Sequence, residues 1–159
     1  MANRTGSISE RAGERGPRSG VFADGSCEGN PGPGGWAWVH VADDRILAEA
    51  SGTDPATTNN RMELRALIEA YRRLPAAAEL TIYSDSRLCI DTINSWAAGW
   101  ERRGWRRKSG PIANLELVKE LYSLARAHPR VRLEWIQAHC GMRWNEYADA
   151  LASAYQRTR

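Results

Sequence analysis

The spacing of hydrophobic residues along the chain predicts its secondary structure, beginning with β-strands. Three β-prone runs come first, at residues 21–23, 36–42 and 45–51, with a turn at residues 43–44 between the last two. The segment between the first two runs, residues 25–35, is dense in Gly and Pro, which is typical of a turn. The sequence therefore predicts a three-stranded meander in the first third of the chain.

A helix follows the meander. Apolar residues recur from Leu64 to Leu74 at the i, i+3, i+4, i+7 spacing of an amphipathic helix, and Thr58 or Asn59 can serve as its N-cap. Pro75 comes directly after this stretch, so the helix is expected to end before it.

The rest of the chain alternates between the hydrophobic spacing of strands and that of helices. The pattern predicts a strand over 80–84, a helix from about 87 through 96, a helix with Leu115, Val118, Leu121, Tyr122 and Ala125 on one face, a strand over 131–136, and a closing helix carrying Trp144, Ala148, Leu151 and Tyr155. The order βββαβααβα, with room for one more short helix in the basic segment, predicts an α/β fold in which helices cover a mixed sheet.

Composition places these elements in one domain. A chain of 159 residues with 42% hydrophobic residues can close a single core. Residues 1–19 have hardly an apolar side chain and cannot offset their ordering entropy, so we expect a disordered N-terminal tail and one catalytic domain over residues 20–159. No apolar run approaches the roughly 20 residues of a membrane span, and no signal-peptide core is visible, which favours a soluble cytoplasmic protein without a membrane partner.

The cysteines and the net charge narrow the function only slightly. Cys27, Cys89 and Cys140 are odd in number and far apart, which suits neither a disulfide framework nor a paired zinc site. The net charge is +3, but the positive residues concentrate in residues 101–108, whereas acidic residues fall singly beside apolar segments. An acidic centre with a basic flank suits a metal-dependent enzyme that acts on phosphates.

Four acidic residues occupy positions from which they can converge. Asp24 is expected at the end of the first strand and Asp85 at the end of the fourth, so both carboxylates would project at one sheet edge if the strands are neighbours. Glu63, in the first turn of its helix, and Asp149, after Ala148, border apolar helix faces that point toward the sheet.

Carboxylates that converge without basic partners repel one another, and divalent cations relieve this cost best. Oxygen ligands favour Mg²⁺ or Mn²⁺ over zinc, and two such ions about 4 Å apart support hydrolysis of a phosphodiester. The alternative for any one of these residues is an ordinary helix cap or solvated turn residue.

Four segments together resemble the type 1 ribonuclease H family, in family order and at family spacing. They are Asp24-Gly25-Ser26-Cys27 with the residues through Gly35, Thr57-Thr58-Asn59-Asn60-Arg61-Met62-Glu63-Leu64, Ser84-Asp85-Ser86, and Ala138-His139-Cys140-Gly141 with the residues through Ala152. The similarity runs from about Val21 to Tyr155.

The resemblance implies a ribonuclease H-like fold with a five-stranded sheet in the order 3-2-1-4-5. It also implies an endoribonuclease that hydrolyses the RNA strand of RNA–DNA hybrids to 5′-phosphate and 3′-hydroxyl products. Two Mg²⁺ ions per site, with Mn²⁺ as a substitute, would be bound by the catalytic residues Asp24, Glu63, Asp85 and Asp149. His139 would move a proton or assist product release, a role that histidine often has in enzymes.

The same resemblance implies the substrate contacts. Cys27, Asn30, Asn59 and Asn60 match positions that contact the RNA strand, and Thr58 and Asn114 match a pocket for a DNA phosphate. A basic protrusion for the DNA strand is matched by Trp96, Trp100, Trp105, Arg102, Arg103, Arg106, Arg107 and Lys108. The alternative for the protrusion is a solvated charge run in which the tryptophans anchor a helical hairpin.

Two positions depart from the family pattern, and two other classes of function stay open. Met142 stands where many relatives have a second histidine, and Ala56 replaces a frequent arginine, which would weaken the phosphate pocket. An inactive nucleic-acid-binding protein of the same fold would lack a carboxylate, yet all four are present. A junction resolvase or exonuclease fits the Gly25-Ser26-Cys27 and Asn59-Asn60 elements less well. Nothing in the sequence indicates more than a monomer.

Overall fold

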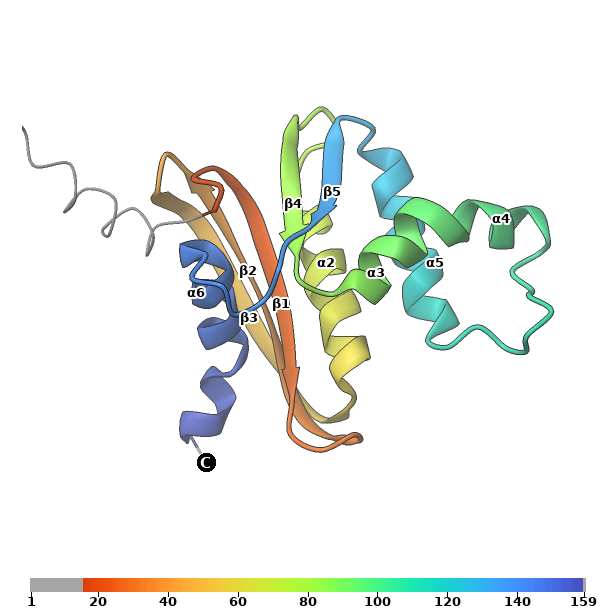
Figure 1. Cartoon of the computed structure of the whole chain (residues 1–159), viewed down its shortest axis with the longest axis horizontal. Helices are drawn as coiled ribbons and strands as arrows, with labels where there is room; N and C mark the ends of the chain where they lie inside the picture. Colours follow the sequence, from red (N-terminus) through yellow and green to blue (C-terminus); the bar gives the residue numbers. More distant parts are fainter. Residues whose placement is uncertain (1–15, 159) are drawn as a thin grey trace, which may run out of the picture.

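A five-stranded mixed sheet forms the centre of the protein, whose computed structural model describes residues 16–158 (Figure 1). Its strands lie in the order β3-β2-β1-β4-β5. They are β1 (Gly20–Cys27), β2 (Gly32–Ala42), β3 (Arg45–Thr57), β4 (Leu80–Ser84) and β5 (Val131–Trp135). β1, β2 and β3 form an antiparallel meander, whereas β4 pairs in parallel with both β1 and β5. The predicted α/β architecture and strand order are confirmed.

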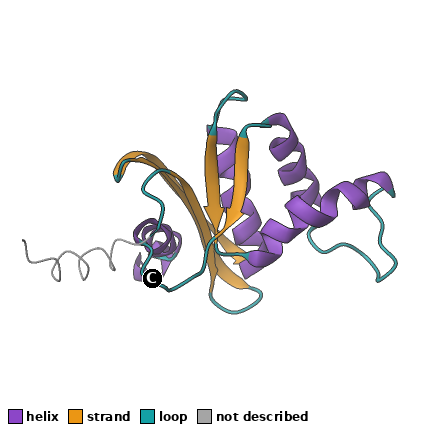
Figure 2. Cartoon of the chain, turned by 45° about the horizontal axis from the view of Figure 1, so that its top comes forward, coloured by secondary structure: helices purple, strands orange, loops and turns teal. Residues whose placement is uncertain are grey.

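Helices cover both faces of this sheet (Figure 2). α6 packs on β1 and β2 from one side, while α2 packs on β1 and β2 from the other and is itself covered by α5. The helical elements are α2 (Asn59–Arg73), α3 (Arg87–Asp91), the π-helical η1 (Thr92–Trp96), α4 (Ala97–Arg102), α5 (Leu115–Ala127), α6 (Arg143–Ala152) and the 3-10 helix η2 (Ala154–Thr158). The larger hydrophobic core lies on the α2 side, and a smaller one lies under α6.

α2 forms where the sequence predicts it. The Thr58 side chain accepts a hydrogen bond from the Arg61 backbone N–H at 3.2 Å, which satisfies one of the donors left free at the helix start. The predicted apolar face is buried, including Leu67 and Tyr71. Helical backbone stops at Arg73, before Pro75, as expected.

The Gly-rich stretch, however, is mostly strand. The prediction of a turn over residues 25–35 was wrong, because β1 continues to Cys27 and β2 begins at Gly32. Glycine is required here for close packing: a Cβ atom on Gly25 would lie 2.4 Å from the backbone N of Glu63 in α2. The missing side chain therefore lets α2 approach β1 closely beside Glu63.

Residues 87–102 form one continuous helical stretch that leads away from the sheet (Figure 1). The predicted helix ends at Trp96, but η1 continues directly into α4, which reaches only the first two residues of the basic segment where a short extra helix had been expected. The Asn94 side-chain amide donates to the Leu133 carbonyl at 2.8 Å, which ties this stretch to β5.

The predicted N-terminal tail, residues 1–19, lies mostly outside the described residues. Its last residues are held against the β2–β3 turn: Arg18 Nε donates to Asp44 Oδ2 at 2.6 Å, and the Asp43 N–H donates to Ser19 Oγ at 2.9 Å. Within the described part of the chain, no helix is long and apolar enough to cross a membrane.

Candidate active site

The parallel pairing of β1 and β4 brings two carboxylates together. Ala23 opposes Ser84 in the last pair of this ladder, and each strand continues by one residue to an aspartate, Asp24 or Asp85. Asp24 is in the middle of β1, not at its end as predicted, because β1 continues its pairing with β2 as far as Cys27. β4 ends beside Asp24. The Asp24 carboxylate therefore lies where the β1–β4 ladder stops.

Glu63 completes a compact acidic trio. It opens the second turn of α2, one turn later than predicted at the helix start, and is only 7% exposed. One carboxylate oxygen each from Asp24, Glu63 and Asp85 lies within 4.8 Å of the others. Asp24 is 3% exposed, whereas Asp85 is half-buried.

Asp149 borders the same cavity from the other side of the sheet edge. It extends from α6, and its carboxyl group contributes to the raised pKa of Asp24. The cavity is lined by Asp24, Gly25, Ser26, Cys27, Asn59, Glu63, Asp85, Ala138, His139 and Asp149. The four carboxylates that the sequence singled out thus surround one hollow, although Asp149 is not part of the tight trio.

The acidic trio is electrostatically unfavourable without a counter-charge. Burial, followed by the charges of Glu63 and Asp85, raises the pKa of Asp24, and burial followed by the charge of Asp85 raises the pKa of Glu63. Glu63 Oε2 is buried and has no hydrogen-bond partner among the described residues. A proton or a cation must therefore neutralise the site, and a trio of carboxylate oxygens suits a divalent cation.

Two further residues hold Asp85 in place. Asn145, in α6 and 3% exposed, donates from Nδ2 to Asp85 Oδ2 at 3.2 Å. The Trp135 indole donates to the Asp85 carbonyl, also at 3.2 Å. The sequence analysis gave Asn145 no role, although its place four residues before Asp149, one helical turn away on the same face, was a signal that could have found it.

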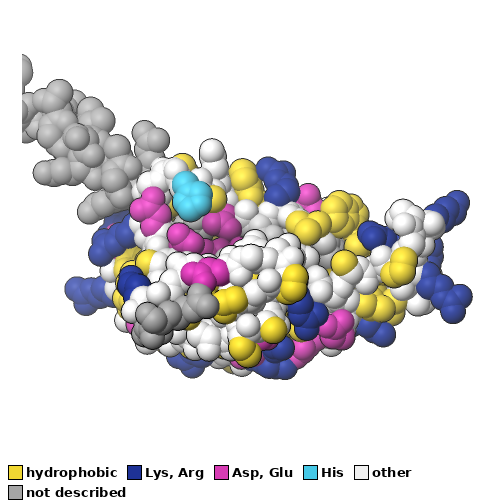
Figure 3. All heavy atoms as spheres, turned by 90° about the horizontal axis from the view of Figure 1, so that it is seen from below, with side chains coloured by type: hydrophobic (Ala, Val, Ile, Leu, Met, Phe, Trp, Pro, Cys, Tyr) yellow, Lys and Arg dark blue, Asp and Glu magenta, His cyan; other side chains and the backbone are white. Residues whose placement is uncertain are grey.

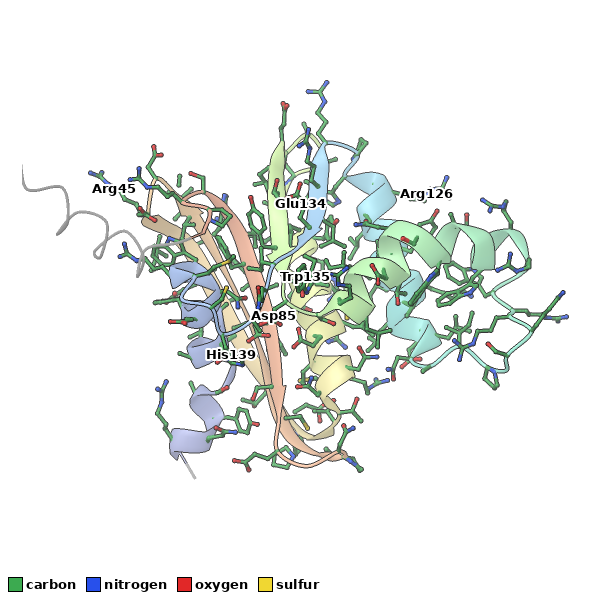
Figure 4. All side chains as sticks on the ribbon, viewed as in Figure 1. Arg45, Asp85, Arg126, Glu134, Trp135 and His139 are labelled. Carbon is green, nitrogen blue, oxygen red and sulfur yellow. The ribbon has the colours of Figure 1, made fainter. Side chains whose placement is uncertain are left out.

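His139 lies at the rim of the cavity, on the loop between β5 and α6 (Figure 4). Its side chain is exposed and its φ of 52° is in the left-handed region. Figure 3 shows acidic side chains and a histidine gathered on this face of the molecule, with basic side chains around them and at both ends.

Comparisons with known proteins agree with this site. A model of the RNase H family matches residues 17–157. The chain belongs to the ribonuclease H family. It is 45% identical over 143 residues to Ribonuclease H of Rhodopirellula baltica, covering 86% of this chain and 89% of that protein. Ribonuclease H of Methylorubrum extorquens is 44% identical over 137 residues, and there the match spans 86% of this chain but only 59% of the relative.

Solved structures of ribonucleases H share the fold. LC9-RNase H1, a type 1 RNase H with the type 2 active-site motif, is 35% identical with a TM-score of 0.73, over 91% of this chain and 75% of that one. LC11-RNase H1, solved in complex with an RNA/DNA hybrid, is 22% identical with a TM-score of 0.61, over 86% of this chain and 97% of that one.

The residues predicted to contact RNA lie beside the carboxylates of this ribonuclease H, with one exception. Cys27 and Asn59 line the carboxylate cavity, and Asn30 is tied to it because its Oδ1 accepts from the Asn59 N–H at 3.3 Å. Asn60 instead accepts from Cys89 Sγ at 3.5 Å, and it lines a neighbouring groove together with Trp96 and Trp100.

The predicted DNA-phosphate pocket contains a cation that sequence reasoning missed. Arg61 donates from Nη1 to Asn114 Oδ1 at 3.1 Å, and its backbone N–H donates to Thr58. The same guanidinium pairs with Glu116 at 2.7 Å. Arg61 therefore lies between Thr58 and Asn114, where Ala56 had suggested a pocket short of positive charge.

The basic protrusion combines exposed cations with partly buried rings. Arg103, Arg106, Arg107 and Lys108 line an open groove, and Arg102 is exposed at the end of α4. Trp105 is half-buried against Tyr122, with ring centroids 5.9 Å apart. Trp96 is 42% exposed and lies 6.0 Å from the Trp100 ring. The anchoring alternative thus describes Trp105 better than Trp96.

The raised carboxyl pKa values predict how the metal-free protein responds to pH. A carboxyl group with a raised folded-state pKa keeps a proton that the unfolded chain has already released, so stability falls as pH rises above the ordinary carboxyl range. Between about pH 5 and 8 this loss is at most about 1.4 kcal/mol per pH unit for each proton held.

Urea denaturation in EDTA across this range tests the prediction. The free energy of unfolding of the unaltered protein should decline more steeply than that of Asp24→Asn, and Glu134→Gln, an exposed carboxylate on β5, serves as the control. Parallel curves for the unaltered protein and Asp24→Asn would contradict the assignment.

Proposed function

We propose that this chain is a metal-dependent endoribonuclease that hydrolyses the RNA strand of RNA–DNA hybrids. The observation that carries the proposal is the trio of carboxylates, two buried and one half-buried, that β1, α2 and the end of β4 bring together in a chain of the ribonuclease H family. A related fold in LC11-RNase H1 binds an RNA/DNA hybrid, which supports the choice of substrate. Hydrolysis by this route leaves a 5′-phosphate and a 3′-hydroxyl.

The donor set fits Mg²⁺, with Mn²⁺ as a substitute. Asp24, Glu63, Asp85 and Asp149 offer only carboxylate oxygens, and the buried, unpartnered Oε2 of Glu63 is one that a cation would satisfy. Two divalent ions, when bound, supply charge that polarises the scissile phosphate and activates water for in-line attack. Asn145 and Trp135 fix Asp85 from two directions, so the carboxylate does not have to reorganise during the reaction.

His139 is suited to proton movement at the rim of the site. Its side chain is exposed to solvent, on the loop that also contains Gly141 with its positive φ of 82°. The imidazole can therefore exchange protons with water and with a product phosphate, whereas the carboxylates remain on β1, α2, the end of β4 and α6.

The surface around the cavity distributes the two strands of the hybrid. Cys27, Asn30 and Asn59 would contact 2′-hydroxyls and the minor groove of the RNA, the features that distinguish RNA from DNA. Asn60 lies on the way to the protrusion. Thr58 and Asn114, with Arg61 between them, would bind a DNA phosphate, and the protrusion would follow the DNA strand. The protein would act as a monomer, because one chain supplies all of these groups.

Cleavage assays distinguish this function from its rivals. Among matched substrates of RNA–DNA hybrid, double-stranded DNA and double-stranded RNA, the protein should cut only the hybrid. Cleavage of double-stranded DNA would indicate a different nuclease on the same fold, and binding without any cleavage would indicate an inactive nucleic-acid-binding protein.

Replacing one trio carboxylate by its amide should abolish cleavage while the fold remains. Asp24→Asn or Asp85→Asn removes a charged metal ligand, and we expect a loss of at least about 10²-fold in kcat in Mg²⁺, in line with the loss of a directly stabilising polar group. Asp43→Asn is the matched control, because this aspartate lies in the β2–β3 turn outside the cavity. Steady-state kinetics on a fixed hybrid, with circular dichroism for the fold, makes the comparison. Near-normal turnover by Asp24→Asn would overturn the proposed metal site.

His139→Ala should act on turnover instead of binding. A group that moves a proton contributes about 10²-fold at the lower end, so kcat should fall by that order while KM changes little. Gln137→Ala, an exposed change in the same loop, is the control. Steady-state kinetics at saturating Mg²⁺ between pH 6 and 9 gives the answer. A raised KM with unchanged kcat would make His139 a binding residue.

A further inference from the structure

An aromatic ring lies directly beside the strand end that carries Asp85. Trp135 is the last residue of β5, and its side chain is 38% exposed although its indole N–H donates to the Asp85 carbonyl at 3.2 Å. Figure 4 shows Trp135 next to Asp85, near His139. The ring is thus fixed at one edge by the acidic site and open to solvent elsewhere.

The guanidinium of Arg87 stacks on this ring. Arg87 begins α3, two residues after Asp85, and its Cζ lies 4.1 Å from the Trp135 ring centroid. This distance is well inside the roughly 6 Å limit for a cation–π interaction. Stacking uses the flat face of the guanidinium and leaves the N–H donors at its edge available, because those donors point outward in the guanidinium plane.

The ring orients this charge without neutralising it. Arg61, Arg72 and Arg126 each form an ion pair with a glutamate, and Arg107 donates to two backbone carbonyls. No salt bridge or side-chain hydrogen bond of Arg87 is present within residues 16–158. Arg87 is therefore an ordered, exposed cation with unused donors at the edge of an acidic cavity.

An acidic cavity repels the polyanion that it has to bind. A cation at its edge offsets this repulsion if it binds a phosphate of the substrate. Planar guanidinium donors match the geometry of phosphate oxygens. Because the carboxylate site receives the scissile phosphate of the RNA strand, the phosphates nearest to Arg87 belong to that strand. This step rests on the proposed function.

We propose that Arg87, stacked on Trp135, binds a phosphate of the RNA strand next to the scissile phosphate and helps to place the scissile one over the carboxylates. Arg87 and Trp135 are not among the substrate-binding residues expected from the sequence. They form a separate contact on the β5 side of the cavity, away from the protrusion.

Binding measured in the Asp24→Asn background with Mg²⁺ tests the contact without cleavage. Adding Arg87→Gln should weaken binding of a short RNA–DNA hybrid by about 3- to 10-fold at low salt and reduce the slope of log Kd against log salt by somewhat less than about 0.9, the value for one lost duplex phosphate contact. Arg130→Gln, an exposed arginine between α5 and β5 at the other end of the sheet, should leave both quantities unchanged. An unchanged slope for Arg87→Gln would overturn the proposal.

Single neutral phosphates locate the contact. In a series of hybrids that each carry one methylphosphonate, one position in the RNA strand, within about two nucleotides of the cleavage site, should weaken binding to the protein with Arg87 but not to the Arg87→Gln protein. If the effect of Arg87→Gln depended on a phosphate of the DNA strand, or on no single phosphate, the proposed contact with the RNA strand would be contradicted.

Trp135 variants separate stacking from structure. Trp135→Leu removes the ring and should reproduce the Arg87→Gln loss, and the double variant should bind no more weakly than either single one. Trp135→Phe keeps a ring and should lose less, which covers the case in which the leucine variant does not fold. In the protein with Asp24 intact and no hybrid bound, Arg87→Gln should leave the affinity for Mg²⁺ unchanged. A changed Mg²⁺ affinity would show that Arg87 acts through Asp85 instead. Failure of the unaltered protein to cut hybrids would reject the proposed function, whereas these outcomes concern Arg87 alone.

Discussion

Mutual repulsion among buried carboxylates is the constraint on which the structure depends. Asp24 and Glu63 are almost fully buried, and their oxygens lie within 4.8 Å of each other and of Asp85. Such a cluster persists only because the surrounding structure is stable enough to impose it. The parallel β1–β4 register places the two aspartates, and the absent side chain of Gly25 lets α2 bring Glu63 to them. Hydrophobic cores on both faces of the sheet supply the stabilisation that offsets the repulsion.

The same constraint explains the distribution of charge around the site. A negative cavity cannot attract a polyanion by itself, so positive charge has to lie at its edges. The arginines of the protrusion and Arg87 on Trp135 provide it at two places, whereas the charge of Arg61 is offset by Glu116. Arg107 is oriented by two backbone carbonyls and Arg87 by a ring, which lowers the entropy lost when a phosphate binds.

Local signals made much of this structure predictable from the sequence, and long-range contacts account for what was missed. α2 was predicted closely because its cap, its apolar period and Pro75 all lie within its own segment. The convergence of the four carboxylates could be expected because each borders an apolar segment, and all four line one cavity. The length of β1 was missed because Gly25 is needed for the close approach of α2, a helix almost forty residues further along the chain. Asn145 and Trp135 hold Asp85 across 60 and 50 residues of sequence, so neither contact belongs to a local pattern. The helical spacing of Asn145 and Asp149 shows only that the two share a face of their own helix.

The metal-free site is expected to hold a proton that a divalent cation displaces, because burial and like charge raise the pKa of its carboxyl groups. Isothermal titration of Mg²⁺ into the protein at pH 7, repeated in buffers with different ionisation enthalpies, counts the protons released on binding. We expect protons to be released when Mg²⁺ binds, because ligands must be deprotonated to bind a metal, and fewer to be released by Asp24→Asn. Equal heats in all buffers, showing that no proton leaves when Mg²⁺ binds, would contradict it.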